Sequence, residues 1–279
     1  MKLKYGVIST ILVILACFVY LIMTNHLIKS FFYIESIQYD KNLTLALGGG
    51  GNSAILNSDT EVLVIDTKFA FHTKKLHTLV KAIAGNKPVI VISTHLHPDH
   101  VGGNALYNGS KIYAGGNYTK ESWEKLSSGA ALPTDWIKDT MELKLGDETV
   151  IIKNIPYNIH TKSDVVVYLK NRKMLFTGDI VLNEQAPFLN NESGADSRGY
   201  LRAFDELQKL YKIEKIIPGH GAIGGSEIIP AFKQYFEDMR VAADQPAKEN
   251  EMLEKYKNWR QLPMVMSNKK VIQFMRHER

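Results

Sequence analysis

Residues 94–103 are the stretch that most constrains how this chain can fold. They carry three histidines and an aspartate, and they follow directly on an apolar run at 89–93. On an extended backbone, side chains two residues apart point to the same side, so His95 and His97 can both reach one metal ion. On a helix the same two rings would diverge by roughly 200°. The spacing therefore predicts a metal site at the end of a strand.

Two further ligand-type side chains follow at once. Pro98 removes a backbone donor and breaks the strand, so we expect the turn there to direct Asp99 and His100 toward a second ion. Gly102 and Gly103 then let the chain leave tightly. The alternative is that these histidines lie in a surface loop or hydrogen-bond to one another. So many ligand-type side chains within six residues favour the metal site.

The rest of the chain offers the additional ligands that two metal ions need, about six or seven in all with room left for water. His160 precedes the strand-like residues 165–169, and Asp179 and His220 each follow a short apolar run. Each stands at the edge or end of a predicted strand, where loops converge and carry function. Taken alone, each could be an ordinary turn or loop residue. Together with the first cluster they predict one composite site.

Seven residues resemble, in type and order, the metal ligands of the metallo-β-lactamase superfamily of dinuclear hydrolases: His95, His97, Asp99, His100, His160, Asp179 and His220. The resemblance implies two zinc ions, one held by His95, His97 and His160, the other by Asp99, His100 and His220, with Asp179 bridging them. Mn²⁺ or iron could occupy the same histidine and carboxylate ligands.

The resemblance covers roughly residues 37–279. It implies a four-layer αββα sandwich with the metals at one edge between two sheets. It also implies that Asp66, at the end of a predicted strand, lies behind the ligands and supports the metal loop. The alternative for Asp66 is a plain turn residue.

Hydrophobic periodicity predicts an α/β protein without help from the resemblance. The spacing predicts helices at 72–84, 197–210 and 227–239, and a terminal helix within 264–279 packed on the body. Short strands are expected at 43–47, 54–56, 62–65, 89–93, 112–114, 141–145, 149–155, 165–169 and 174–176. The composition of 89–93 predicts a strand buried on both faces.

Three segments give weaker patterns. The glycines at 48–51 lack the Gly-Lys-Ser/Thr ending of a phosphate-binding loop, so we expect a flexible strand connection. Residues 118–136 are less regular, and Trp123 or Trp136 could line a substrate pocket, although core packing is the expected role. The charged residues 242–260, interrupted by a proline, predict a solvated helix face.

Residues 5–25 carry no charge and approach the ~20 residues that cross a bilayer. We expect a short tail at 1–4, a transmembrane anchor at 5–25, a linker at 26–36 and the hydrolase domain at 37–279. Lys2 and Lys4 favour a cytoplasmic N-terminus and an extracytoplasmic catalytic domain. The alternative is a signal peptide whose cleavage leaves a secreted or periplasmic protein. Cys17 is the only cysteine, so no internal disulfide can form.

The net charge of +5 comes without a long Lys/Arg run, so nucleic acid is not an expected partner. The expected partners are a small-molecule substrate and the membrane, while the sequence sets no oligomeric state. Two adjacent ions would share a water and lower its pKa toward about 7, which provides a bridging hydroxide as nucleophile. Asp99 can orient that water or accept a proton.

The expected reaction is hydrolysis of a small ester, thioester, lactone or lactam. β-Lactamases of this family commonly carry cysteine at the position of Asp179, whereas aspartate there resembles thioesterases and lactonases. A true β-lactamase stays an alternative, and residues 178–221 bear a weaker likeness to zinc hydrolases of quinoprotein systems. From a different class, the chain could be a non-catalytic metal-binding accessory protein.

Overall fold

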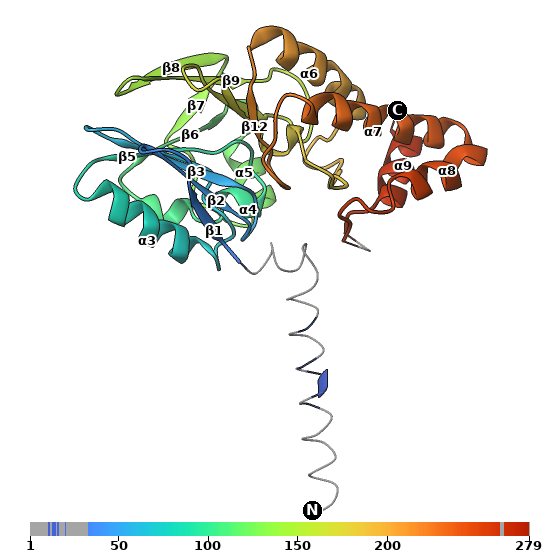
Figure 1. The fold of residues 1–279 in the computed structure, drawn as a ribbon, viewed down its shortest axis with the longest axis horizontal. Helices are drawn as coiled ribbons and strands as arrows, with labels where there is room; N and C mark the ends of the chain where they lie inside the picture. The colour runs from blue at the N-terminus through green and yellow to red at the C-terminus, as the bar shows by residue number, and fades with distance from the viewer. Residues whose placement is uncertain are drawn as a thin grey trace, which may run out of the picture.

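Figure 1 shows the computed structural model of this protein, which describes residues 33–262 and 265–278 and the isolated positions 11, 13, 14, 16 and 20. Apart from those five positions, the expected anchor at 5–25 lies outside the described residues. Within the part of the chain that the structure describes, no helix is long and apolar enough to cross a membrane. The boundaries between tail, anchor, linker and domain stay predictions.

The first half of the described chain forms a seven-stranded sheet whose strands follow one another in sequence order. Neighbours pair antiparallel from β1 to β4 and parallel from β4 to β7. The pairing changes where helix α3 (Thr73–Ala84) connects β4 to β5, because parallel neighbours need a crossover. The strands are β1 (Glu35–Gln38), β2 (Leu43–Leu47), β3 (Ser53–Asn57), β4 (Val62–Ile65), β5 (Val89–Ile92), β6 (Lys111–Gly115) and β7 (Asp135–Ile137).

The second half forms a five-stranded sheet in the order β12-β11-β10-β9-β8. Its pairs are antiparallel except β11 with β12, which run parallel with helix α6 (Ser197–Leu210) between them in sequence. The strands are β8 (Thr140–Leu145), β9 (Glu148–Asn154), β10 (Val165–Leu169), β11 (Met174–Phe176) and β12 (Lys215–Ile217).

Strands buried on both faces join the layers. In β4, Leu63 and Ile65 pack into the core between the two sheets, whereas Val62 and Val64 pack toward α3. Strand β10 does the same for the other sheet, with alternate residues in the core between the sheets and in the core beneath the outer helices. This alternation follows from the two-residue period of a strand and requires apolar residues at every position.

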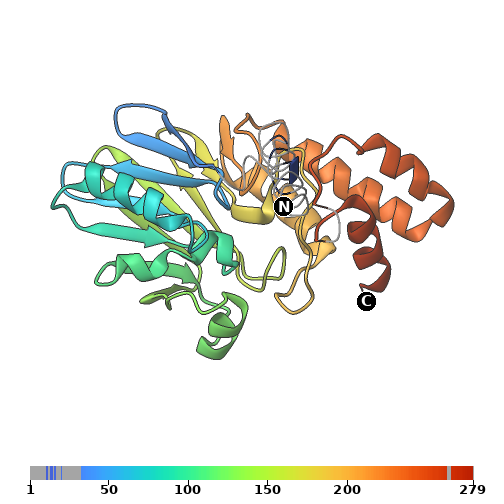
Figure 2. The same cartoon turned by 90° about the horizontal axis from the view of Figure 1, so that it is seen from below.

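The helices cover the outer faces, so the chain folds as the four-layer αββα sandwich that the resemblance implied. Helix α3 packs on the first sheet, and α6, α7 (Ile228–Asp244) and α9 (Asn268–His277) pack over the second. Figures 1 and 2 show α7, α8 (Glu249–Lys255) and α9 grouped at one side of the sandwich. The shorter elements are α4 (Pro98–Val101), α5 (Lys120–Leu126), η1 (Asn104–Tyr107), η2 (Gly178–Ile180) and η3 (Pro246–Lys248).

The expected strands and long helices are confirmed, and the differences lie mainly at weak patterns. The turn expected at Pro98 is the short helix α4, and the irregular region 118–136 contains α5. Helix α7 runs to Asp244, beyond the expected end at 239, because Ala242 and Ala243 face the core. Strand β5 is fully buried only in its second half.

The structure also tests the expectations for the two tryptophans and for the charged segment 242–260. Trp123 is fully buried in a small core with Leu96 and Tyr118, and neither it nor Trp136 lines the cavity at the candidate site. The charged segment 242–260 is more than a solvated face, because Met252 and Tyr256 are buried in the core beneath the second sheet.

Candidate metal centre

The seven predicted ligands lie in loops and short helices that follow strands. His95 and His97 lie in the loop after β5, and Asp99 and His100 lie in α4. The other three come from the second sheet: His160 from the loop between β9 and β10, Asp179 from η2 after β11, and His220 from the loop after β12. The two sheets therefore contribute ligands from strand ends that meet at one edge of the sandwich.

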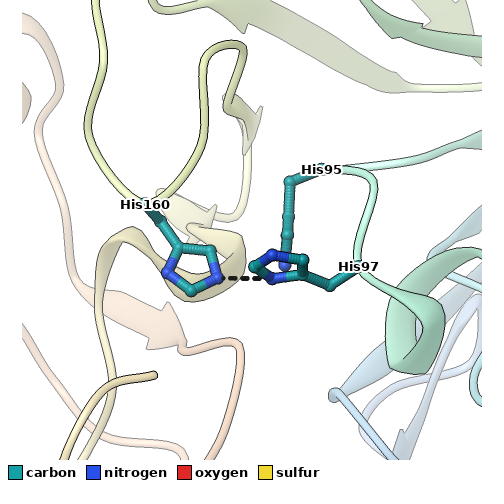
Figure 3. A group of neighbouring side chains, drawn as sticks. All are labelled: His95, His97 and His160. Atoms are coloured by element: carbon teal, nitrogen blue, oxygen red, sulfur yellow. Dashed lines mark hydrogen bonds between the residues drawn. The ribbon is translucent and has the colours of Figure 1, made fainter. Parts of the chain in front are cut away.

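Three histidines form the first ligand group. The candidate ligand atoms of His95, His97 and His160 lie within 4.8 Å of one another. Nδ1 of His97 is 2.8 Å from Nε2 of His160, as Figure 3 shows. Nε2 of His95 is buried and has no hydrogen-bond partner among the described residues. A buried nitrogen of this kind is costly unless a ligand such as a metal ion satisfies it.

Asp99, His100 and His220 form the second ligand group, again with candidate ligand atoms within 4.8 Å of one another. Nε2 of His220 is 3.0 Å from Oδ2 of Asp99 and 3.4 Å from Nε2 of His100. The side chains of Asp99 and His220 retain about a fifth of their exposure, whereas His100 is fully buried. The open side of this group therefore faces solvent.

Asp179 lies between the two groups. Its Oδ1 is 3.2 Å from Nε2 of His100 and 3.5 Å from Nε2 of His220, and its Oδ2 is 3.5 Å from Nε2 of His160. The structure therefore brings all seven predicted residues together and places the carboxylate of Asp179 where it faces both groups.

The donor chemistry of this cluster fits divalent cations. Burial lowers the pKa of His95 and His97, and it lowers the pKa of His160 to about 3, so these rings are neutral and can offer lone pairs. Burial alone would raise the pKa of Asp99 and Asp179, but the neighbouring histidines outweigh it and hold both carboxylates ionised. Neutral imidazoles beside carboxylates are ligands that Zn²⁺ prefers.

The histidines of the second group show the opposite shift. Burial opposes their charged form, but the carboxylates around them raise the pKa of His100 well above its usual range and also raise that of His220. Asp99 and Asp179 act on both rings, and Asp66 acts on His100. The carboxylates that attract a proton here would also attract a metal cation.

Asp66 lies where the sequence prediction requires it, behind the ligands. Its Oδ2 is 2.7 Å from Nδ1 of His100, and its carboxylate accepts hydrogen bonds from the backbone N–H and hydroxyl of Thr94. Oγ1 of Thr94 in turn lies 3.1 Å from Nδ1 of His95. Asp66 therefore orients one ligand directly and fixes the loop that carries another.

Sequence reasoning missed two partners of the first group. Oγ of Ser193 lies 3.2 Å from Nε2 of His97. The hydroxyl of Tyr200 lies 2.9 Å from Nδ1 of His160 and donates to the carbonyl oxygen of Asp179. Tyr200 stands on the inward face of α6, where the helical pattern alone indicates only core packing.

The glycines at 48–51 are part of the site and not only a flexible connection. A Cβ on Gly51 would lie 2.1 Å from the ring of His100, so only glycine permits this approach. Gly219 has the same role on the other side, because a Cβ there would lie 2.0 Å from Oδ1 of Asp179. These glycines let backbone pack directly against two of the candidate ligands.

A buried lysine supports the same loop. Lys68 is fully buried and donates from Nζ to the carbonyl oxygens of Ala46 and Gly51 at 2.6 and 2.5 Å. Burial lowers the pKa of Lys68 to about 7, although the carboxylates of Asp66 and Asp99 oppose that shift. Lys68 therefore ties the glycine loop to the strand behind it.

A cavity of about 280 Å³ opens over the cluster, and we call it the apolar cavity. Four candidate ligands contribute to its lining: His97, Asp99, Asp179 and His220. Its other walls are mainly apolar and comprise Phe69, Leu182, Phe188, Leu262, Val265 and Met266. The ligand groups are thus open to the outside through a largely apolar space.

Comparison with known proteins agrees with this geometry. Residues 46–220 match the family described as the metallo-beta-lactamase superfamily. A metallo-beta-lactamase type 2 from Bacillus sp. (strain 170) is 26% identical over 180 residues, which are 64% of this chain and 69% of that protein. The acyl-coenzyme A thioesterase MBLAC2 from Homo sapiens is 25% identical over 174 residues, which are 53% of this chain and 61% of that protein.

A solved structure shows the same fold. The metallo-beta-lactamase from Pontibacter korlensis superposes with a TM-score of 0.63 and 22% sequence identity, over 74% of this chain and all of that one. The family match spans more than half of this chain and includes all seven candidate ligands. The chain therefore belongs to the metallo-beta-lactamase superfamily, and it is a metal-dependent hydrolase of that family.

Proposed function

We propose that this protein is a membrane-anchored hydrolase that cleaves an ester or thioester of a small acyl group, within the wider class that includes lactones and lactams. The observation that carries the proposal is the apolar cavity, which opens directly onto His97, Asp99, Asp179 and His220. A largely apolar space over a polar floor suits an acyl group whose carbonyl must reach the ligands. The relatives named acyl-coenzyme A thioesterase support this bond class.

The proposed ligand sets are the two groups of the structure, with Asp179 facing both and Asp66 behind His100. Two bound Zn²⁺ ions, or Mn²⁺ or iron in their place, would supply Lewis acidity and an activated water. The chain itself supplies positioning, since each histidine of the first group has a hydrogen-bonding hydroxyl at its second ring nitrogen.

Asp99 is the catalytic group that we assign to orienting the water. Its carboxylate is ionised, lines the apolar cavity and keeps partial exposure, so it can accept a hydrogen bond from a water above the floor and fix the direction of that water. Nε2 of His220 lies 3.0 Å from Oδ2 of Asp99, so the imidazole of His220 interacts electrostatically with that carboxylate. Phe69 and Phe188 line the apolar cavity beside this region.

A true β-lactamase is the second candidate. Several relatives carry the name metallo-beta-lactamase type 2, from Bacillus cereus and Bacteroides fragilis as well as Bacillus sp.. The two candidate activities can be distinguished by assay, because the hydrolysis of a chromogenic cephalosporin and of an acyl thioester can be measured on the same preparation.

Membrane attachment rests on the uncharged residues 5–25 and the two lysines before them. We propose a single-pass anchor with the catalytic domain outside the cytoplasm. A reporter fused to the C-terminus and active only after export tests this orientation. Retention in the membrane fraction after carbonate washing separates an anchor from a cleaved signal peptide.

The function is tested with full-length protein in detergent, loaded with Zn²⁺ and offered a panel of esters, thioesters, lactones and β-lactams. We expect turnover of esters or thioesters that His97→Ala abolishes. Lys111→Ala, at an exposed position in β6, serves as the control that keeps activity. Stoichiometric metal without turnover of any panel member would contradict the proposal.

A further inference from the structure

A second cavity adjoins the apolar cavity and differs from it in chemistry. This polar cavity has a volume of about 270 Å³ and is lined by Tyr33, Glu35, Asn52, Gln185, His220 and Arg260, among others. Both cavities are lined by Gly50, Gln185 and His220, so they meet at one of the candidate ligands. A molecule cleaved at that point can extend an arm into each cavity.

The C-terminal segment builds walls of both cavities. Its backbone pairs with the loop after η2, where Arg260 donates to the carbonyl of Glu184 at 2.7 Å and Ala186 donates to that of Arg260 at 2.9 Å. Further along, Leu262 and Met266 exchange backbone hydrogen bonds of 2.8 and 2.9 Å. This segment lies outside the family match at 46–220, so these walls belong to this chain's own C-terminal region.

Arg260 places a positive charge in the wall of the polar cavity. The side chain is half-buried, and its guanidinium has no hydrogen bond or ion pair within the described part of the chain. Glu35 is the acidic residue on the same wall, but it is exposed and forms no ion pair with Arg260. A partly desolvated guanidinium is the side chain best suited to a carboxylate or phosphate.

The apolar cavity can receive the other arm. Leu262, Val265 and Met266 form one of its walls, and four candidate ligands lie at its floor. Its volume of about 280 Å³ and its apolar walls suit an unbranched acyl chain of medium length with its carbonyl at the floor.

We propose that the substrate is an acyl ester or thioester with a medium-length aliphatic acyl chain and an anionic leaving group. The acyl chain lies in the apolar cavity against Met266, and the carboxylate or phosphate of the leaving group binds Arg260 in the polar cavity. This inference rests on the proposed ester or thioester hydrolase function and specifies its substrate.

The first test uses two series of straight-chain acyl thioesters, one of 2-mercaptoethanol and one of 3-mercaptopropionate, with metal-loaded full-length protein. We expect kcat/KM to rise about fourfold per methylene until the chain fills the apolar cavity, and then to rise no further. The anionic series should exceed the neutral series by about tenfold at every length. Equal rates for short and long chains, or for the two leaving groups, would overturn the proposal.

Matched variants assign each preference to its cavity. Arg260→Gln should remove the anionic preference and leave the dependence on chain length unchanged. Lys257→Gln removes an equal charge from an exposed surface position that is paired with Glu254, and it should change neither preference. Met266→Trp should shift the optimum to shorter chains, and Met266→Ala should shift it to longer ones.

Binding of thioether analogues, which lack the scissile carbonyl, is measured by calorimetry on the same full-length proteins. Tighter binding with chain length, and an anionic preference that Arg260→Gln removes, are the supporting results. This readout separates the two proposals, because a protein without turnover that still binds in this pattern would refute only the hydrolase function. Binding insensitive to chain length or to Arg260 would refute the substrate assignment itself.

Discussion

The two ligand groups at the edge of the sandwich differ in charge. His95 and His160 are buried and His97 is half-buried, the pKa values of all three are lowered, and hydroxyl groups hold their second ring nitrogens. In the other group, carboxylates raise the pKa of His100 and His220, and His100 rests on the charged Asp66. The first group is organised by neutral hydrogen bonds, whereas the second is organised by charge.

If the site binds two cations as proposed, this difference gives the two ions distinct tasks. The neutral group lies deeper, because His97 is its one member that lines the apolar cavity, so it suits a tightly held ion. The charged group borders the apolar cavity and includes Asp99, so it suits an ion that also meets the substrate. Asp179 faces both groups, so we expect cooperation between the two proposed ions to depend on it.

Removal of Asp179 should therefore have the largest effect. We expect Asp179→Ala to lower kcat/KM on the best ester or thioester by on the order of 10³ and to lower the metal content. The fold should persist, because the sheets and their cores do not depend on this side chain. If Asp179→Ala keeps two metal equivalents and wild-type turnover, the carboxylate of Asp179 does not bridge the two ions.

Removing one ligand from each group should cost a different ion in each case. His160→Ala and His220→Ala should each reduce metal stoichiometry by about one equivalent, because each removes a ligand from one group. We expect His220→Ala to retain the ion of the first group, which is bound more tightly. We expect His160→Ala to retain the ion of the second group, which is bound more weakly. Plasma emission spectrometry after dialysis against graded chelator measures both, and identical release profiles would contradict the assigned difference.

The residues that hydrogen-bond to the candidate ligands should also differ in how much they contribute to metal affinity. Asp66→Asn removes the charge that holds His100, and we expect metal affinity to fall roughly 10- to 100-fold. Ser193→Ala removes a neutral partner of His97 and should cost less than Asp66→Asn. Competition with a fluorescent chelator gives both values. A larger loss in Ser193→Ala would reverse the proposed roles of charge and neutral hydrogen bonding.

Lys68 adds a test of pH dependence in stability. Its folded-state pKa of about 7 lies below the ordinary 10.5, so between these values the unfolded chain binds more protons and the free energy of unfolding rises with pH. Relative to Lys68→Met, the wild type should gain roughly 1 kcal/mol per pH unit across this window. Denaturant unfolding at several pH values measures the slope, with the exposed Lys81→Met as the control. A difference independent of pH would show that Lys68 is not buried as a near-neutral amine.

The sequence predicted the elements with strong periodicity and the residues with diagnostic chemistry. The burial of β4 and β10 on both faces follows from runs of apolar residues, and the spacing of His95 and His97 indicates a shared ion. His160 and His220 stand at the edges or ends of predicted strands, which indicates a composite site, and the family resemblance adds which ion each would hold. The structure confirms that all of them meet.

The remaining features depend on tertiary contacts that no local pattern encodes. Ser193 and Tyr200 look like ordinary loop and core residues until the fold brings them beside His97 and His160. Lys68 would be expected at the surface, and only its burial beneath the glycine loop shows its role. The C-terminal wall at Arg260 and Met266 arises from backbone pairing across the chain, which periodicity cannot locate.

Anomalous diffraction at the zinc edge from crystals of the full-length protein grown with Zn²⁺ tests the two-group assignment most directly. We predict two peaks roughly 3.5–4 Å apart, one beside His95, His97 and His160 and the other beside Asp99, His100 and His220. The carboxylate of Asp179 should lie between them. A single peak in saturating Zn²⁺, or peaks away from these side chains, would contradict the assignment.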